Sequence, residues 1–96
     1  ATSVVMETMH DRLEWALEAA GVSLRGASLA AGLAPAAVGL ILSRRGAIEL
    51  ETARALSGAL GVSLDWLASG TGPTPDPAAV RAAVDAARSA QAEVAA

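Results

Sequence analysis

One stretch, residues 24–43, most strongly limits the folds that this chain can adopt. Its first half has small residues at helical spacing, namely Ala27, Ser28 and Ala31. Gly32 follows where such a helix would end, and glycine enters the left-handed backbone conformation of a helix C-terminus without steric cost. The pattern therefore predicts a short helix that is ended by a glycine turn.

A second short helix is predicted over residues 35–42. Pro35 is tolerated in a first helical turn, and Leu33 is expected to be buried in the turn before it. The residues that would face inward recur at helical spacing, at Val38, Ile41 and Leu42. Two short helices joined by a glycine turn, with this apolar pattern, are typical of a helix-turn-helix.

The chain before this stretch predicts one helix over about residues 7–20, ended by Gly21. Trp15 falls outside its apolar face, so it covers a neighbouring segment or a second subunit, or is a partly exposed packing residue. Ser23 is a favourable N-cap for the next helix. The inward face of the first helix is expected to contain Met9, Leu13, Ala16, Leu17 and Ala20.

Two more helices are predicted after a turn over residues 43–46. The first starts near Glu49 and stops at Gly61, and Ser63 caps the second, which is short. The expected buried residues are Leu50, Ala53, Leu56 and Leu60 in the first and Leu64, Trp66 and Leu67 in the second.

A linker rich in Pro and Gly, residues 71–77, precedes a last predicted helix over residues 78–96. Asp76 would cap this helix, with Pro77 at its first position. Within it, small and apolar residues recur at coiled-coil spacing. We call these residues the C-terminal row, which is expected either to pair two chains in a homodimer or to lie back on its own domain: Val80, Val84, Ala87, Gln91 and Val94.

Composition supports an all-α fold and excludes several kinds of site. The 96 residues are 53% hydrophobic but only 2% aromatic, and a core of small side chains requires closely packed helices. The absence of Cys excludes disulfides and thiolate metal sites. A single histidine, His10, without a glycine-rich phosphate loop or a nucleophile and base at catalytic spacing, predicts no enzyme, no cofactor and no small-molecule substrate.

An uncharged run of 18 residues, 26–43, has the length of a membrane span. Gly32 and Pro35 lie in its middle, and a spanning segment must stay helical unless other protein covers it. We therefore expect no membrane as a partner. No signal peptide is recognised, so a cytoplasmic location is expected.

Residues 9–73 resemble the Xre/Cro-like (lambda-repressor-like) helix-turn-helix family. Its small residue, turn glycine and core residues match Ser28, Gly32, Leu33, Val38 and Ile41. RLEWALEAAGVS (residues 12–23) resembles its first helix, and LETARALSGALGVSLDWLASGTGP (residues 50–73) its fourth and fifth helices. The resemblance implies an all-α, five-helix domain over residues 7–70, preceded by a tail over 1–6 and followed by the linker and the C-terminal helix.

The resemblance also implies a dimeric transcriptional regulator that binds double-stranded DNA, with its third helix in the major groove and its second across the backbone. The arginines would contact phosphates, and the serines would be neutral hydrogen-bond donors. The residues implied to contact DNA are Ser23, Arg25, Ala34, Ala36, Ala37, Gly39, Leu40, Ser43, Arg44 and Arg45.

The third helix departs from the family on its outward side. Residues 35–42 include no Arg, Asn or Gln, the side chains that form bidentate contacts with bases. The glutamine that the family usually has at the start of helix 2 is Leu24 here, and the usual glutamate two residues on is Gly26. The formal net charge of −3 is also unusual for a nucleic-acid binder. The alternative is a protein-interaction module that kept the fold and lost sequence-specific DNA recognition.

Overall fold

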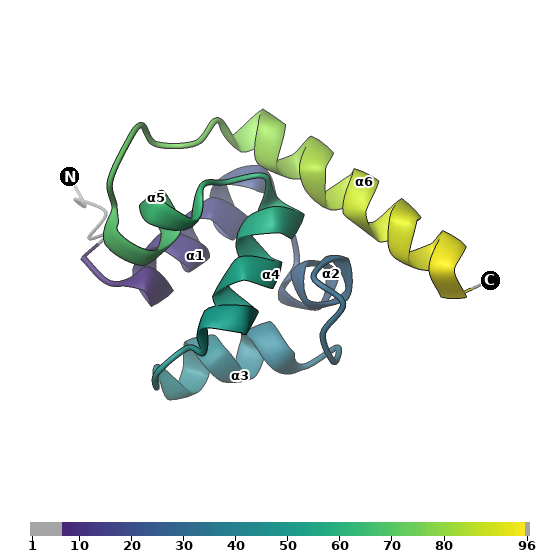
Figure 1. Ribbon diagram of the computed structural model, residues 1–96, viewed down its shortest axis with the longest axis horizontal. Helices are drawn as coiled ribbons and strands as arrows, with labels where there is room; N and C mark the ends of the chain where they lie inside the picture. The colour runs from purple at the N-terminus through teal and green to yellow at the C-terminus, as the bar shows by residue number, and fades with distance from the viewer. Residues whose placement is uncertain (1–6, 96) are drawn as a thin grey trace.

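The computed structural model describes residues 7–95, and their side chains as far as Glu93. This part of the chain is helical and has no strand, which confirms the predicted all-α fold of five helices and a C-terminal helix. Figure 1 shows α6 lying along one side of the other helices and extending beyond them at its C-terminal end. The helices are α1 (Met9–Ala20), α2 (Leu24–Ala30), α3 (Ala37–Arg44), α4 (Leu50–Leu60), α5 (Leu64–Ser69) and α6 (Pro77–Ala95).

Hydroxyl side chains cap the N-termini of α1, α2 and α5. Thr8 caps α1, so this helix begins two residues later than expected: the Thr8 hydroxyl accepts from the Asp11 amide at 3.1 Å, and the Asp11 carboxylate accepts from the Thr8 amide at 3.3 Å. Ser23 caps α2 as predicted, accepting from the Gly26 amide at 2.9 Å. Ser63 caps α5 in the same way.

Helix α3 is displaced by two residues from its predicted range of 35–42. The Ala37 amide donates to the Ala34 carbonyl at 2.9 Å, so the chain completes a tight turn before the helix starts. At the other end the helix continues through Arg44, and Arg45 takes a left-handed φ of 50° as its cap. The predicted turn over residues 43–46 is therefore wrong in its first half, because nothing there interrupts the helix.

The core is built mainly from leucines of α1, α4 and α5, with small residues filling the contacts between helices. Trp66 is buried, and the half-buried Trp15 packs edge-on against it with ring centroids 6.1 Å apart. Trp15 therefore covers a neighbouring segment of its own chain. The prediction for Leu50 is wrong: it is 59% exposed, since it is the first residue of α4 and lies beyond the core. The fully buried leucines are Leu13, Leu17, Leu56, Leu60 and Leu67.

Helix α6 begins as predicted, with the Asp76 carboxylate accepting from the Ala78 amide at 3.2 Å and Pro77 at its first position. It packs against α1, α2 and α4 of the same chain. This contact buries Val80 and Val84, so at these two positions the C-terminal row lies back on its own domain and is closed to a second chain. Ala87 is half-buried and Gln91 is exposed, whereas the Val94 side chain lies outside the described residues.

The uncharged run at residues 26–43 does not form one helix. The turn around Gly32, which has a φ of 73°, divides it between α2 and α3. Over residues 7–95, none of the helices has both the length and the apolar character needed to cross a bilayer.

Candidate nucleic-acid interface

The turn between α2 and α3 is held by main-chain hydrogen bonds around Gly32. The Gly32 amide donates to the Leu29 carbonyl at 3.1 Å, and the Leu33 amide donates to the Ser28 carbonyl at 2.9 Å. Gly32 supplies the left-handed backbone that this geometry needs, as the sequence predicted. Leu33 is half-buried against the core, so the turn is anchored on one side and exposed on the other.

Ser28 connects the two helices of the motif. Its hydroxyl is fully buried, donates to the Leu24 carbonyl at 2.9 Å and accepts from the Val38 amide at 3.0 Å. Ala36, the N-cap residue of α3, has no side chain able to accept a hydrogen bond. Ser28 therefore supplies from α2 the acceptor that the first turn of α3 lacks, and it fixes where α3 starts relative to α2.

Replacing Ser28 with alanine is expected to lower the free energy of unfolding by about 1–2 kcal/mol, because the buried Val38 amide loses its acceptor. Urea unfolding followed by circular dichroism measures this loss. Ser57→Ala is the matched control, since the Ser57 hydroxyl only donates to the Arg54 carbonyl within α4 and no amide depends on it. Equal losses for both variants would mean that Ser28 does not anchor α3.

The outward side of α3 is open to solvent. Leu40 is 46% exposed, and Ala37 and Gly39 are half-buried at the edges of this surface. Leu24, at the start of α2, is 43% exposed beside it. The structure thus leaves open the residues implied to contact DNA around α3, of which the exposed ones are Ala34, Ala36, Leu40, Ser43, Arg44 and Arg45.

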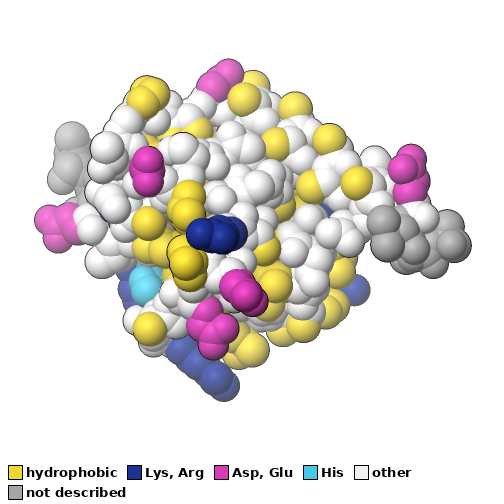
Figure 2. Space-filling model, in the orientation of Figure 1, with side chains coloured by type: hydrophobic (Ala, Val, Ile, Leu, Met, Phe, Trp, Pro, Cys, Tyr) yellow, Lys and Arg dark blue, Asp and Glu magenta, His cyan; other side chains and the backbone are white. Residues whose placement is uncertain are grey.

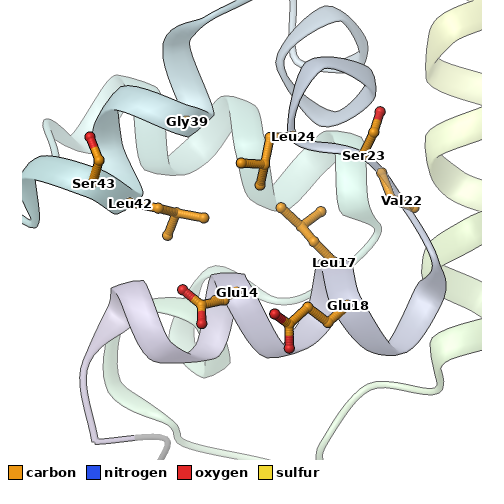
Figure 3. A pocket seen from close by; sticks show the side chains of 9 residues that line it. All are labelled: Glu14, Leu17, Glu18, Val22, Ser23, Leu24, Gly39, Leu42 and Ser43. Atoms are coloured by element: carbon orange, nitrogen blue, oxygen red, sulfur yellow. The ribbon is translucent and has the colours of Figure 1, made fainter.

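A hollow of about 530 Å³ borders this surface where α1, α2 and α3 meet. Figure 3 shows Leu17, Leu24 and Leu42 pointing into it, with the Glu14 and Glu18 carboxylates along its α1 side. Ser23 and Ser43, both implied to contact DNA, lie at its other edges. The two carboxylates place negative charge next to this part of the interface, which opposes the approach of phosphates.

The arginines of the interface differ in their surroundings. Arg25, in the first turn of α2, and Arg44, in the last turn of α3, are exposed. On the face shown in Figure 2, basic and acidic side chains are scattered and do not form one basic patch. Phosphate binding would therefore depend on individual arginines at the two ends of the motif.

Arg45 is engaged within the chain. It forms an ion pair with Asp11, and its guanidinium donates to the Thr8 hydroxyl at 3.2 Å. The His10 Nε2 atom lies 2.8 Å from the Gly46 carbonyl oxygen, a second contact between the start of α1 and the segment after α3. These contacts could not be predicted from the sequence, because no local pattern relates residues 34 or more positions apart.

The hydrogen bond from Arg45 is the main cause that lowers the pKa of the Asp11 carboxyl below its ordinary value. Because the folded-state pKa is the lower one, the stabilisation is present at pH values above the unfolded-state pKa. It is lost as the pH falls through the folded-state pKa. Near neutral pH, phosphate contact by Arg45 would have to compete with the Asp11 carboxylate.

The Gly32 turn and the contact of Ser28 with α3 define a helix-turn-helix domain in which the outward side of α3 is exposed. A family model described as helix-turn-helix, of the Cro/C1 or lambda-repressor-like type, matches residues 13–67, more than half of the chain. The chain belongs to this family of DNA-binding regulators, which confirms the resemblance found in its sequence. Searches of curated proteins and of solved structures gave no significant match.

Helix α6 lies outside the residues that the family model matches. No group of His, Asp and Glu side chains among the described residues is arranged to hold a metal ion.

Proposed function

We propose that this chain regulates transcription by binding duplex DNA, with α3 in the major groove and α2 across the backbone. One observation carries the proposal: Ser28 and the Gly32 turn fix α3 on the domain, while its outward side stays uncovered. A rigid helix with a free outward side is what insertion into the major groove requires. The small side chains Ala36 and Ala37 allow this helix to approach the base edges closely.

Affinity in this proposal comes mainly from phosphates. Arg25 and Arg44 lie at opposite ends of the motif and are the exposed arginines best placed for two backbone contacts. Two contacts correspond to a slope of roughly −2 in a plot of log K against log salt. Without a bidentate side chain on the outward side of α3, discrimination between sequences would come from thymine methyl contacts and from DNA shape.

Homodimerisation stays a prediction. Pairing through the whole C-terminal row would require α6 to leave its own domain, since Val80 and Val84 are buried there. If α6 stays on its own domain, two chains would have to pair through the part of the C-terminal row after Val84, where Gln91 is exposed. The proposed DNA contact is therefore that of one protomer, and a dimer would double the number of phosphate contacts.

Replacing Ala36 with glutamate tests the proposed interface. Ala36 is exposed at the N-terminus of α3, where a carboxylate suits the helix dipole but would meet the phosphates and base edges of bound DNA. We expect binding to a 20-base-pair duplex at 50 mM salt to weaken about ten-fold or more, which corresponds to at least about 1.4 kcal/mol. Fluorescence anisotropy with labelled duplex measures the change.

Ala82→Glu is the matched control, because Ala82 is exposed on α6 and the change in net charge is the same. We expect this control to bind within about three-fold of the wild type, since only long-range repulsion is added. If both variants bind equally, the α3 surface is not the DNA interface. Failure of the wild type to bind at 50 mM salt would end the proposal.

The exposed leucines support one other function, a protein-interaction module. Leu24, Leu40 and Leu50 are the large hydrophobic residues most exposed in the described chain, and they belong to three successive helices of the domain. If this chain is an interaction module, it should not bind DNA, and Leu40→Glu should abolish its self-association or its complex with a partner. Unchanged association of this variant would exclude α3 as the docking surface.

A further inference from the structure

Helix α6 brings two arginines beside the start of α2. Arg81 and Arg88 both line a hollow of about 170 Å³ whose opposite wall includes Ser23 and Gly26 at the start of α2. Arg88 also borders a neighbouring hollow of about 400 Å³ beside Leu29 at the other end of α2. We propose that Arg88 is a DNA-phosphate contact supplied by α6, outside the residues that match the family. This inference rests on the proposed function.

Gly26 provides the room that Arg88 occupies. The Arg88 Nη1 atom would lie 3.6 Å from a Cβ atom at position 26, and that Cβ atom would also come within 2.9 Å of the capping hydroxyl of Ser23. Because position 26 has no side chain, the guanidinium of Arg88 can lie beside the start of α2.

The charge of Arg88 is free to bind an external anion. Arg81 forms an ion pair with Asp85 at 3.7 Å and donates to the Gly21 carbonyl at 3.4 Å. Within the described part of the chain, Arg88 has no ion pair. Asp85 also lines the hollow, but its carboxylate is directed to Arg81, one turn before it on α6.

The position of Arg88 fits the path of the DNA backbone. In a helix-turn-helix complex the first helix of the motif crosses the backbone, so phosphates would pass close to the start of α2, where Ser23 and Arg88 line the same hollow. Leu24, at the start of α2, has no side-chain donor for a phosphate. Arg88, with Arg25 nearby in the first turn of α2, would supply the donor that Leu24 lacks, as a stronger charge-assisted hydrogen bond.

Arg88→Gln tests this contact in the full chain. We expect its affinity for a 20-base-pair mixed-sequence duplex at 50 mM salt to fall about five- to ten-fold, and the salt slope to become shallower by about 0.9. Arg54→Gln, an exposed position on α4 with the same change in charge, should bind within about two-fold of the wild type with an unchanged slope. Arg88→Lys should keep most of the affinity, and circular dichroism checks that every variant is folded.

The outcomes separate this inference from the proposed function. If Arg88→Gln and Arg54→Gln change affinity and slope equally, Arg88 contributes only net charge and the inference is overturned, while the effect of Ala36→Glu would still support DNA binding by α3. If the wild type binds no duplex at 50 mM salt, the inference and the proposed function both fail.

Discussion

Replacing Arg12 with methionine is expected to lower the free energy of unfolding by about 2–4 kcal/mol. Arg12 is buried in α1, where its Nε donates to the Leu67 carbonyl at 2.8 Å and its Nη2 donates to the Ala68 carbonyl at 2.8 Å. These carbonyls belong to the last turn of α5, whose acceptors have no partner within the helix. A guanidinium here also interacts favourably with the negative end of the helix dipole.

Urea unfolding of Arg12→Met and the wild type measures this loss. Methionine can occupy much of the volume of the arginine stem, so the loss reports mainly on the missing donors. Arg25→Met is the matched control, because Arg25 is exposed and surface changes cost within about 0.5 kcal/mol. If Arg12→Met unfolds at the same urea concentration as this control, Arg12 does not hold α5 against α1.

Gly61→Ala is expected to have a similarly large effect, a loss of about 3 kcal/mol in the free energy of unfolding. Gly61 ends α4 with a left-handed φ of 66°, which a residue with a Cβ atom adopts only under strain. The new Cβ atom would lie 2.9 Å from the Cβ atom of Ala83 on α6. Neither atom can rotate away, so α6 would have to move off the end of α4.

The Gly21→Ala variant separates the backbone strain at a left-handed residue from the contact of the new Cβ atom with α6. Gly21 ends α1 with nearly the same φ, 68°, but its new Cβ atom would meet only the end of the flexible Arg81 side chain, at 3.4 Å. This control should lose only the backbone strain of about 1–2 kcal/mol. Hydrogen exchange of α6 should become faster in Gly61→Ala than in Gly21→Ala. Equal stability and equal exchange in the two variants would contradict the packing of α6 on α4.

The helices could be predicted from the sequence because their ends are determined locally. Ser23 caps the helix that directly follows it, and Gly61 ends the helix that directly precedes it, so each signal lies beside its effect. The sequence prediction starts α1 too early and does not use Thr8 as its cap, although Thr8 and Asp11 have the spacing of a capping box. Helical periodicity identified most of the inward positions, but Leu50 is exposed, and Leu64, which was also expected to be buried, is only half-buried.

The details of the interface could not be predicted, because they depend on contacts between distant residues. The sequence predicted only a small residue at Ser28, whereas its hydroxyl anchors Val38 ten positions away. It presented Arg45 as a cation available for phosphate, whereas Asp11 of α1 pairs with it. Helical spacing on α6 showed that Val80 faces inward, but spacing cannot tell whether the inward partner is the same chain or a second one.

A titration of the ¹⁵N-labelled protein with a 20-base-pair duplex, followed by amide NMR, tests most directly whether the open α3 surface binds DNA. If this surface binds DNA, we expect the largest shifts over residues 34–44 and at the start of α2, with little change in α5. Shifts concentrated on other helices, or an unchanged spectrum at 50 mM salt, would contradict it.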